Sequence, residues 1–223
     1  MSEGGLAFET FPGKAGPEWM MRIGPAEAPP ILFVPPLFEE MNRTRALIVA
    51  IMRALAARHH GCWLPDLAGT GESLRALGDV GWNDWRHDVT SAASYIAEKA
   101  GKPLVASLRG GVLLDDAATA RAHWRFAPAD GAALSRDMVR AGLAGVEWAG
   151  YAPSAELKAD LAAAKPEPVS PLRLVRLATD AQPADAKVAG PALWRRSEPG
   201  TSEALAEALA ADIHDWSRAC ADS

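Results

Sequence analysis

A short turn at residues 107–111 is the first place where chemistry is expected. Its sequence, Ser-Leu-Arg-Gly-Gly, lies between an apolar segment at residues 103–106 and a segment of helical composition at residues 112–122. Small residues two places before and after a central position permit the sharp strand-to-helix turn that displays a nucleophile in many enzymes. The displayed residue is Arg109, and a guanidinium stays protonated and cannot attack a carbonyl. The turn therefore has the pattern of a nucleophile elbow without a nucleophile.

Two acidic residues are expected near this turn. Glu39 and Glu40 follow the apolar segment at residues 31–34, in the loop that supplies the second oxyanion donor of ordinary elbow enzymes. A cation at the start of a helix is disfavoured by the helix dipole and needs a negative partner. We therefore predict an ion pair between Arg109 and either Glu39 or Glu40.

The same loop predicts a polar binding pocket. Asn42 and Arg43 follow the two glutamates, so one pocket would contain two guanidiniums, two carboxylates and an amide, which suits a carboxylate, phosphate or sugar-bearing ligand. The alternative is an internal ion pair that only replaces lost catalytic groups. The binding residues predicted beside the charged ones are Leu37, Phe38, Asn42, Arg43, Gly110 and Trp194, the last as a surface on which a sugar can stack.

The remaining serines and histidines are weaker candidates. Ser107 lies two places before the displayed position, and Ser73 has no assigned base, so each is expected to bond the backbone instead of attacking a carbonyl. His214 follows Ile213 on a C-terminal helix and is expected to face away from the elbow. These residues provide no nucleophile and no base for the turn.

Hydrophobic periodicity predicts the elements that position these residues. Two N-terminal strands joined by a turn are followed by alternating strands and helices, and a proline-rich connector at residues 165–171 precedes the last strand. Residues 146–151 are predicted to be extended. The predicted strands are residues 6–10, 19–23, 31–34, 62–64, 103–106, 123–127 and 172–178, and the predicted helices are residues 42–58, 83–100, 112–122, 131–144, 154–164 and 205–216.

This order of elements predicts the fold class. It indicates a three-layer α/β protein with a mostly parallel sheet of about seven or eight strands and helices on both faces. The chain of 223 residues is predicted to form a single domain, residues 1–223, with a small helical insertion at about residues 131–164. Chemistry is expected at the carboxyl ends of the strands.

Composition excludes several classes of function. The net charge of −5 and the absence of a dense basic run argue against a nucleic-acid partner. Two distant cysteines fit no metal or redox spacing, and the dinucleotide fingerprint is not completed, so no metal and no cofactor are expected. The sequence has no basic leader and no long apolar run. It predicts a soluble, cytoplasmic protein without a membrane span that acts on a small-molecule ligand or acyl substrate, and it leaves the oligomeric state open.

Several longer motifs carry a resemblance to a known family. The chain resembles α/β-hydrolase-fold proteins, and most of all the family called exosortase A system-associated hydrolase 2. The Asp-x-x-Gly-x-Gly-x-Ser loop is common to many α/β-hydrolases, whereas Pro-Pro-x-x-Glu-Glu-Met-Asn and the arginine-bearing elbow are narrower. The stretches that carry the resemblance are PPLFEEMNRTR (35–45), LPDLAGTGES (64–73), WNDWRHDV (82–89), SLRGG (107–111), WRFAPADG (124–131), VEWAGYAPSAEL (146–157) and GPALWRRSE (190–198).

The resemblance implies an α/β-hydrolase fold, an activity similar to that of esterases and thioesterases, and a link to bacterial exopolysaccharide and exosortase systems. Carried over by position, the family's elbow is Arg109, its acid loop is Thr179 and Asp180, and its base region is residues 192–194, which contain no histidine. Two of the three members of a catalytic triad are therefore absent.

Two main functions follow from these observations. The first is a hydrolase in which the Gly110 N–H and Arg109 stabilise an oxyanion while Glu39, Glu40 or Asp180 activates water. Its weakness is that a carboxylate held by arginine is expected to have a depressed pKa and to be a poor base near neutral pH. The second is a non-catalytic pseudo-hydrolase that binds a small anionic or sugar-bearing ligand. A purely structural role of the insertion is a third, less supported alternative.

Overall fold

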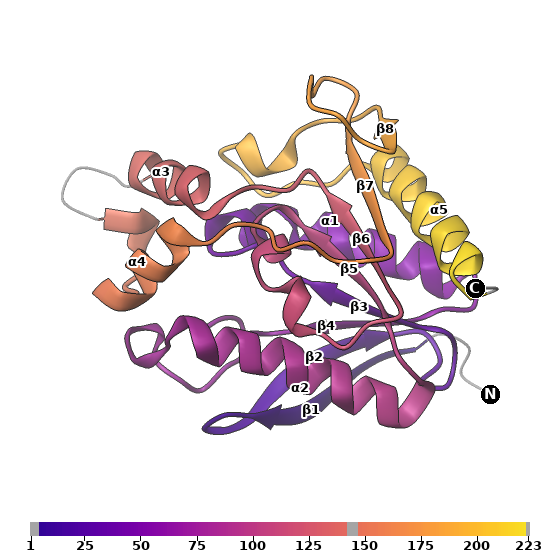
Figure 1. Ribbon diagram of the computed structural model, residues 1–223, viewed down its shortest axis with the longest axis horizontal. Helices are drawn as coiled ribbons and strands as arrows, with labels where there is room; N and C mark the ends of the chain where they lie inside the picture. The colour runs from indigo at the N-terminus through magenta and orange to yellow at the C-terminus, as the bar shows by residue number, and fades with distance from the viewer. Residues whose placement is uncertain (1–4, 142–146, 222–223) are drawn as a thin grey trace.

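The computed structural model describes residues 5–141 and 147–221, which form an eight-stranded sheet (Figure 1). The strands lie in the order β1-β2-β4-β3-β5-β6-β7-β8. β2 is antiparallel to β1 and to β4, and all other neighbours are parallel. The strands are β1 (Leu6–Gly13), β2 (Gly16–Ile23), β3 (Pro30–Val34), β4 (Gly61–Pro65), β5 (Leu104–Leu108), β6 (Ala122–Phe126), β7 (Leu172–Leu177) and β8 (Ala186–Val188).

The central strands are buried because both of their faces are covered. Every residue of β3, β4, β5 and β6 is buried, as expected for parallel strands between two helical layers. Each predicted strand coincides with an observed one. The edge strand β8 was not predicted, because its three residues are too few to show a pattern of alternation.

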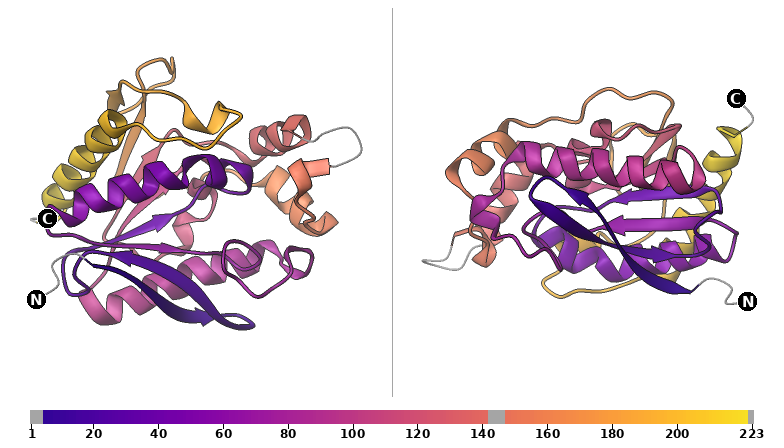
Figure 2. Two further views of the ribbon diagram at one scale, coloured as in Figure 1. Left: turned by 180° about the vertical axis from the view of Figure 1, so that it is seen from behind. Right: turned by 90° about the horizontal axis from the view of Figure 1, so that it is seen from below.

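Helices cover both faces of the sheet, as Figures 1 and 2 show. Helices α1 (Glu39–Ala56) and α5 (Glu203–Ala219) lie together on one face and bury apolar stripes that include Leu47, Ile51, Leu209 and Ile213. Helix α2 (Trp82–Ala100) covers the other face with Trp85, Val89 and Ile96. Helices α3 (Gly131–Ala141) and α4 (Ala155–Ala163) pack near the ends of the strands. No helix of the described residues is long and apolar enough to cross a bilayer.

Two local predictions are wrong, and a third lies partly outside the described residues. No α-helix forms at residues 112–122: the chain makes two 3₁₀ turns, Arg109–Leu113 and Asp115–Ala117, and then enters β6. Leu114 between the turns has φ −121° and ψ −14°, which interrupts a helix. The segment predicted to be extended at residues 146–151 contains a 3₁₀ turn, Glu147–Gly150. The predicted end of the helix at residues 142–144 lies outside the described residues.

The centre of the sheet brings two loops together. β3 pairs with β4 on one side and with β5 on the other, so the chain reverses its direction of winding at this point, where parallel α/β sheets bind ligands. A Cβ atom at Gly111 would lie only 2.5 Å from the Val34 carbonyl oxygen and 2.6 Å from that of Pro35. Glycine is therefore required for the turn after β5 to pack against the loop after β3.

Candidate functional site

The turn after β5 has the backbone of a strained elbow. Arg109 follows the last residue of β5 directly and has a φ of 52°, in the left-handed region that residues with a side chain rarely occupy. Nucleophile elbows place their displayed residue on such a strained turn. However, the helix dipole invoked above does not act on Arg109, because only a short 3₁₀ turn follows it.

The guanidinium of Arg109 is held on several sides. Its Nε and Nη2 donate to Oε1 of Glu40 at 3.1 and 2.8 Å, and its Nη1 donates to the Ala127 carbonyl at 2.9 Å. Its Cζ lies 4.7 Å from the ring centroid of Trp194, within the range of a cation–π interaction. The predicted ion pair is therefore confirmed, with Glu40 as the partner. A fixed cation occupies the place of a nucleophile.

Glu40 is a buried carboxyl group with one unused oxygen. The residue is 5% exposed and lies in the first turn of α1. Its Oε2 is buried and has no hydrogen bond of normal geometry among the described residues. Burial raises the pKa of Glu40, and the charge and hydrogen bonds of Arg109 and the backbone of Gly110 oppose only part of this effect. The expectation of a depressed pKa at this carboxylate is therefore wrong, because burial outweighs the lowering by Arg109.

Glu39 and its neighbours form a different group. Glu39 Oε1 pairs with Arg43 Nε at 3.3 Å, and Arg43 Nη1 donates to the Trp194 carbonyl at 3.1 Å. Asn42 Nδ2 donates to Glu39 Oε2 at 3.2 Å and to the Tyr151 hydroxyl at 2.7 Å. Burial, together with the charge of Glu39, raises the pKa of Tyr151. These contacts connect α1 to the segment that precedes α4.

Asp180 lies in the loop after β7, close to Arg109. Its Oδ1 accepts the Gln182 N–H at 2.9 Å, and its Oδ2 accepts from Arg176 Nη1 at 2.8 Å. The Gln182 hydrogen bond and then the Arg176 hydrogen bond hold the pKa of Asp180 below its ordinary value. Both oxygens are occupied and the group stays ionised, so Asp180 is a weak base near neutral pH.

The structure divides the predicted pocket into two. The first, called the aromatic pocket below, has a volume of about 200 Å³ and is lined by the predicted residues Leu37, Phe38 and Asn42. The second, called the elbow pocket, has a volume of about 210 Å³ and is lined by Arg109, Asp180, Trp194 and their neighbours. The four other predicted residues, Glu39, Glu40, Arg43 and Gly110, line neither of these two pockets. Neither of these two pockets contains all the charged residues of the predicted one.

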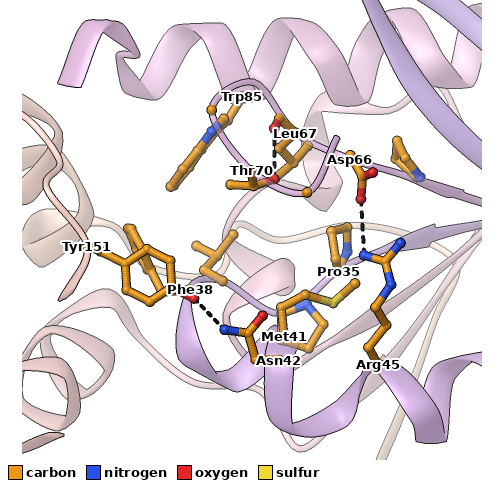
Figure 3. A pocket seen from close by; sticks show the side chains of 15 residues that line it. Pro35, Phe38, Met41, Asn42, Arg45, Asp66, Leu67, Thr70, Trp85 and Tyr151 are labelled. Carbon is orange, nitrogen blue, oxygen red and sulfur yellow. Dashed lines mark hydrogen bonds and ion pairs between the residues drawn. The ribbon is translucent and has the colours of Figure 1, made fainter. Parts of the chain in front are cut away.

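The aromatic pocket has an apolar side and a charged side (Figure 3). Phe38 contacts Trp85 and Tyr151 edge-on, each at a centroid distance of 5.4 Å. On the opposite side, Arg45 Nη1 pairs with Asp66 Oδ1 at 3.2 Å. Aromatic rings facing a few placed polar groups are typical of small-molecule sites.

Among the lining residues that the sequence interpretation did not assign to this pocket are Arg45, Asp66, Trp85 and Tyr151. Arg45 had a usable signal, because it lies three positions after Asn42 on the same helix and such residues share a face. Asp66 had one as well, because it directly follows β4, the strand next to β3. Tyr151 had none, because it reaches the pocket from a distant part of the chain.

The hydroxyl groups of both candidate serines form hydrogen bonds within the protein. Ser107 Oγ donates to Asp115 Oδ2 at 2.6 Å, and the same carboxylate accepts from Arg125 Nε and Nη2 at 2.9 and 2.7 Å. Ser107 thus bonds a side chain and not the backbone, contrary to expectation. Ser73 Oγ accepts the Gly69 N–H at 2.9 Å, which is a backbone bond as predicted.

His214 lies at the opposite end of the sheet from the elbow. Its Nδ1 is 2.9 Å from His60 Nε2, and His60 directly precedes the first residue of β4. Because β4 and β5 run in the same direction as β3, the start of β4 and the end of β5 are at opposite edges. The prediction that His214 faces away from the elbow is confirmed.

Solved structures share this architecture. The esterase domain of a Rhodothermus marinus protein matches with a TM-score of 0.61 and 15% identity, covering 96% of this chain and 98% of that one. A hyperthermophilic esterase from the archaeon Pyrobaculum calidifontis matches with a TM-score of 0.57 and 15% identity, covering 95% of this chain and 83% of that one. No protein-family model and no curated protein matches the sequence. The chain has the α/β-hydrolase fold, as predicted.

Proposed function

We propose that this α/β-hydrolase-fold protein binds a small sugar-bearing ligand in the aromatic pocket and forms no covalent intermediate at its elbow. The observation that carries the proposal is the position of Arg109 and the contacts that hold it. Its guanidinium occupies the nucleophile position and is bound to Glu40 and to the Ala127 carbonyl. Covalent acyl transfer needs a nucleophile activated by a neighbouring base, and the elbow provides neither.

The lining of the aromatic pocket supports a sugar as the ligand. A sugar has apolar C–H faces that pack on aromatic rings and hydroxyl groups that need both donors and acceptors. Phe38 and Tyr151 offer the rings, while Asn42 and the pair of Arg45 and Asp66 offer amide, guanidinium and carboxylate groups. A volume of about 200 Å³ suits roughly one monosaccharide unit.

Replacing Tyr151 by alanine is expected to weaken glycoside binding. Loss of one aromatic contact corresponds to roughly a two- to twelvefold change in Kd, from about 0.5–1.5 kcal/mol per aromatic contact. The measurement is a fluorescence titration with a panel of methyl glycosides, in which Trp85 in the pocket wall serves as the reporter. At least one glycoside should bind saturably to the unmodified protein.

Tyr95→Ala is the matched control for that experiment. Tyr95 donates to Glu9 Oε2 at 2.9 Å and does not line the aromatic pocket, so its replacement should leave the Kd unchanged. The sugar proposal is wrong if no glycoside binds saturably, or if both tyrosine variants bind the ligand as the unmodified protein does.

Ester or thioester hydrolysis is the second candidate. One observation favours it: the pKa of Glu40 is raised by burial, and its Oε2 is free of a normal hydrogen bond. Such a carboxylate can take a proton from water, while Arg109 and the Gly110 N–H would stabilise the oxyanion. Two observations disfavour it. Glu40 lines neither pocket, and the backbone of Gly110 already acts on the Glu40 carboxylate.

The wider biological setting is also a proposal. The resemblance to the exosortase-associated family supports a role beside bacterial exopolysaccharide and protein-sorting systems, where a sugar ligand would be at hand. We further propose that residues 1–223 form one domain with an insertion at about residues 131–164. A cytoplasmic location stays a prediction from the sequence.

A further inference from the structure

We infer that the elbow pocket is a second binding site, separate from the aromatic pocket, that takes a small oxyanion through Arg195, Trp194 and Arg109. All three residues line this pocket of about 210 Å³. None of them lines the aromatic pocket, so the inference does not depend on the sugar ligand.

The charges around the elbow pocket leave a positive excess. Arg109 is paired with Glu40, and Asp180 is paired with Arg176, so these four charges balance. Arg195 is exposed, and among the residues that the structure describes it has no ion-pair partner. An anion in the pocket would therefore meet one unpaired guanidinium beside two balanced pairs.

Lys187 adds a positive charge next to Asp180, although it does not line the pocket. Its Nζ donates to the Asp180 carbonyl oxygen, which brings a second positive charge to the loop after β7. The Asp180 carboxylate is the group that would repel an anion. Its two oxygens are engaged by the Gln182 N–H and by Arg176 of β7, so its charge is compensated by Arg176.

Trp194 offers an unused hydrogen-bond donor. It is 7% exposed, and its indole Nε1 is buried with no hydrogen-bond partner among residues 5–141 and 147–221. Buried N–H donors are paired in most proteins, and an unpaired one calls for an explanation such as a ligand absent from the structure. A bound oxyanion supplies the acceptor that this donor lacks.

The geometry of the pocket also favours an anion. Its wall is formed by the elbow after β5, the loop after β7 and the 3₁₀ turn Leu193–Arg195. These are the chain positions at which an α/β-hydrolase carries its nucleophile, acid and base. In this chain they carry Arg109, Asp180 and the pair of Trp194 and Arg195. Where an α/β-hydrolase places the groups that transfer protons, this chain places guanidinium and indole N–H donors.

Titration calorimetry with inorganic phosphate tests the inference on the full chain. We expect saturable binding that weakens as sodium chloride is added, because salt screens a partly exposed charge. Arg195→Gln should weaken phosphate binding at least tenfold. Arg196→Gln is the matched control: Arg196 is the adjacent, exposed arginine and does not line the pocket, so its replacement should change the Kd less than twofold.

Three results would overturn the inference. The first is no phosphate binding at millimolar concentration, and the second is an equal loss in both arginine variants, which would indicate surface charge in general. The third is phosphate binding that Arg195→Gln leaves unchanged. Glycoside binding by Arg195→Gln, measured on the same samples, should equal that of the unmodified protein. Failure of the sugar proposal and failure of the anion site are therefore distinguishable.

Discussion

Replacing Arg109 by methionine is expected to lower the free energy of unfolding by about 3–5 kcal/mol at pH 7.5, the usual cost of removing one partner of a buried ion pair. The Glu40 carboxylate would stay buried without its cation, since it is 5% exposed. Arg109 also donates to the Ala127 carbonyl at 2.9 Å, and this bond is lost as well. The measurement is urea unfolding followed by tryptophan fluorescence.

The loss should be smaller at pH 5 than at pH 7.5. Burial already raises the pKa of Glu40 above its ordinary value of 4.5, and removal of Arg109 raises it further. Between the unfolded and the folded pKa, the folded variant binds more protons than the unfolded chain, so its stability increases as the pH falls through this window. A loss that grows towards acid pH would contradict this account.

Two further variants isolate the ion pair. Arg109→Met combined with Glu40→Gln should recover part of the loss at pH 7.5, because no unpaired carboxylate remains. Arg58→Met is the control for removing a partly exposed arginine. Arg58 pairs with Glu207, whose side chain is 59% exposed, and such pairs contribute about 0.2–1 kcal/mol. If Arg109→Met costs no more than Arg58→Met, the pair with Glu40 is not a buried one.

Replacing Asp115 by asparagine is expected to cost about 3–5 kcal/mol, because the charge of Arg125 then stays buried without a counter-ion. Asp115 is 0% exposed and Arg125 is 5% exposed. The carboxylate accepts two hydrogen bonds from Arg125 and one from Ser107. Chemical unfolding at neutral pH measures the effect, and glycoside binding of the folded variant should be unchanged because Asp115 does not line the aromatic pocket.

Asp116→Asn is the control in the neighbouring position. Asp116 pairs with Arg86 at 2.7 Å, and their side chains are 17% and 33% exposed. Partly exposed pairs contribute less than buried ones, so we expect a loss of no more than about 1 kcal/mol. Equal losses in the two variants would show that the bonds of Ser107 and Arg125 to Asp115 do not stabilise the fold as proposed.

The sheet and its main helices could be predicted because their patterns are local. β3 and β5 consist mainly of apolar residues, β6 alternates apolar and polar residues, and α1 and α2 have apolar stripes at helical spacing. The contact of Arg109 with Glu40 could be predicted because the two residues follow β5 and β3, which are neighbours in the sheet. In such cases the strand order alone predicts which distant residues meet, and the packing of their side chains need not be known.

The segment after the elbow could not be predicted, because its conformation depends on distant partners. Composition favours a helix at residues 112–122. However, Ser107 and Arg125 are register partners in β5 and β6, and both bind Asp115 in the second 3₁₀ turn. The segment forms two short turns instead of a helix, because these buried tertiary bonds outweigh the helix propensity of its residues.

The division of the binding site into two pockets could not be predicted from the sequence either. The predicted pocket combined every charged residue near the elbow, because chain order cannot show which charges neutralise each other. In the structure Glu39 binds Arg43, Glu40 binds Arg109, and Asp180 binds Arg176. The order of elements does not determine this side-chain pairing, so the sequence could not show which charged residues line which pocket.

The central claim is that the elbow of this protein holds a fixed cation and performs no acyl transfer. Its most direct test is hydrolysis of short- and medium-chain p-nitrophenyl esters and acyl thioesters, measured on a preparation that also binds a methyl glycoside. The account predicts no turnover above the buffer blank in the unmodified protein or in Glu40→Gln. Turnover in the unmodified protein that disappears in Glu40→Gln would contradict it, and would identify Glu40 as the base of a hydrolase without a serine nucleophile.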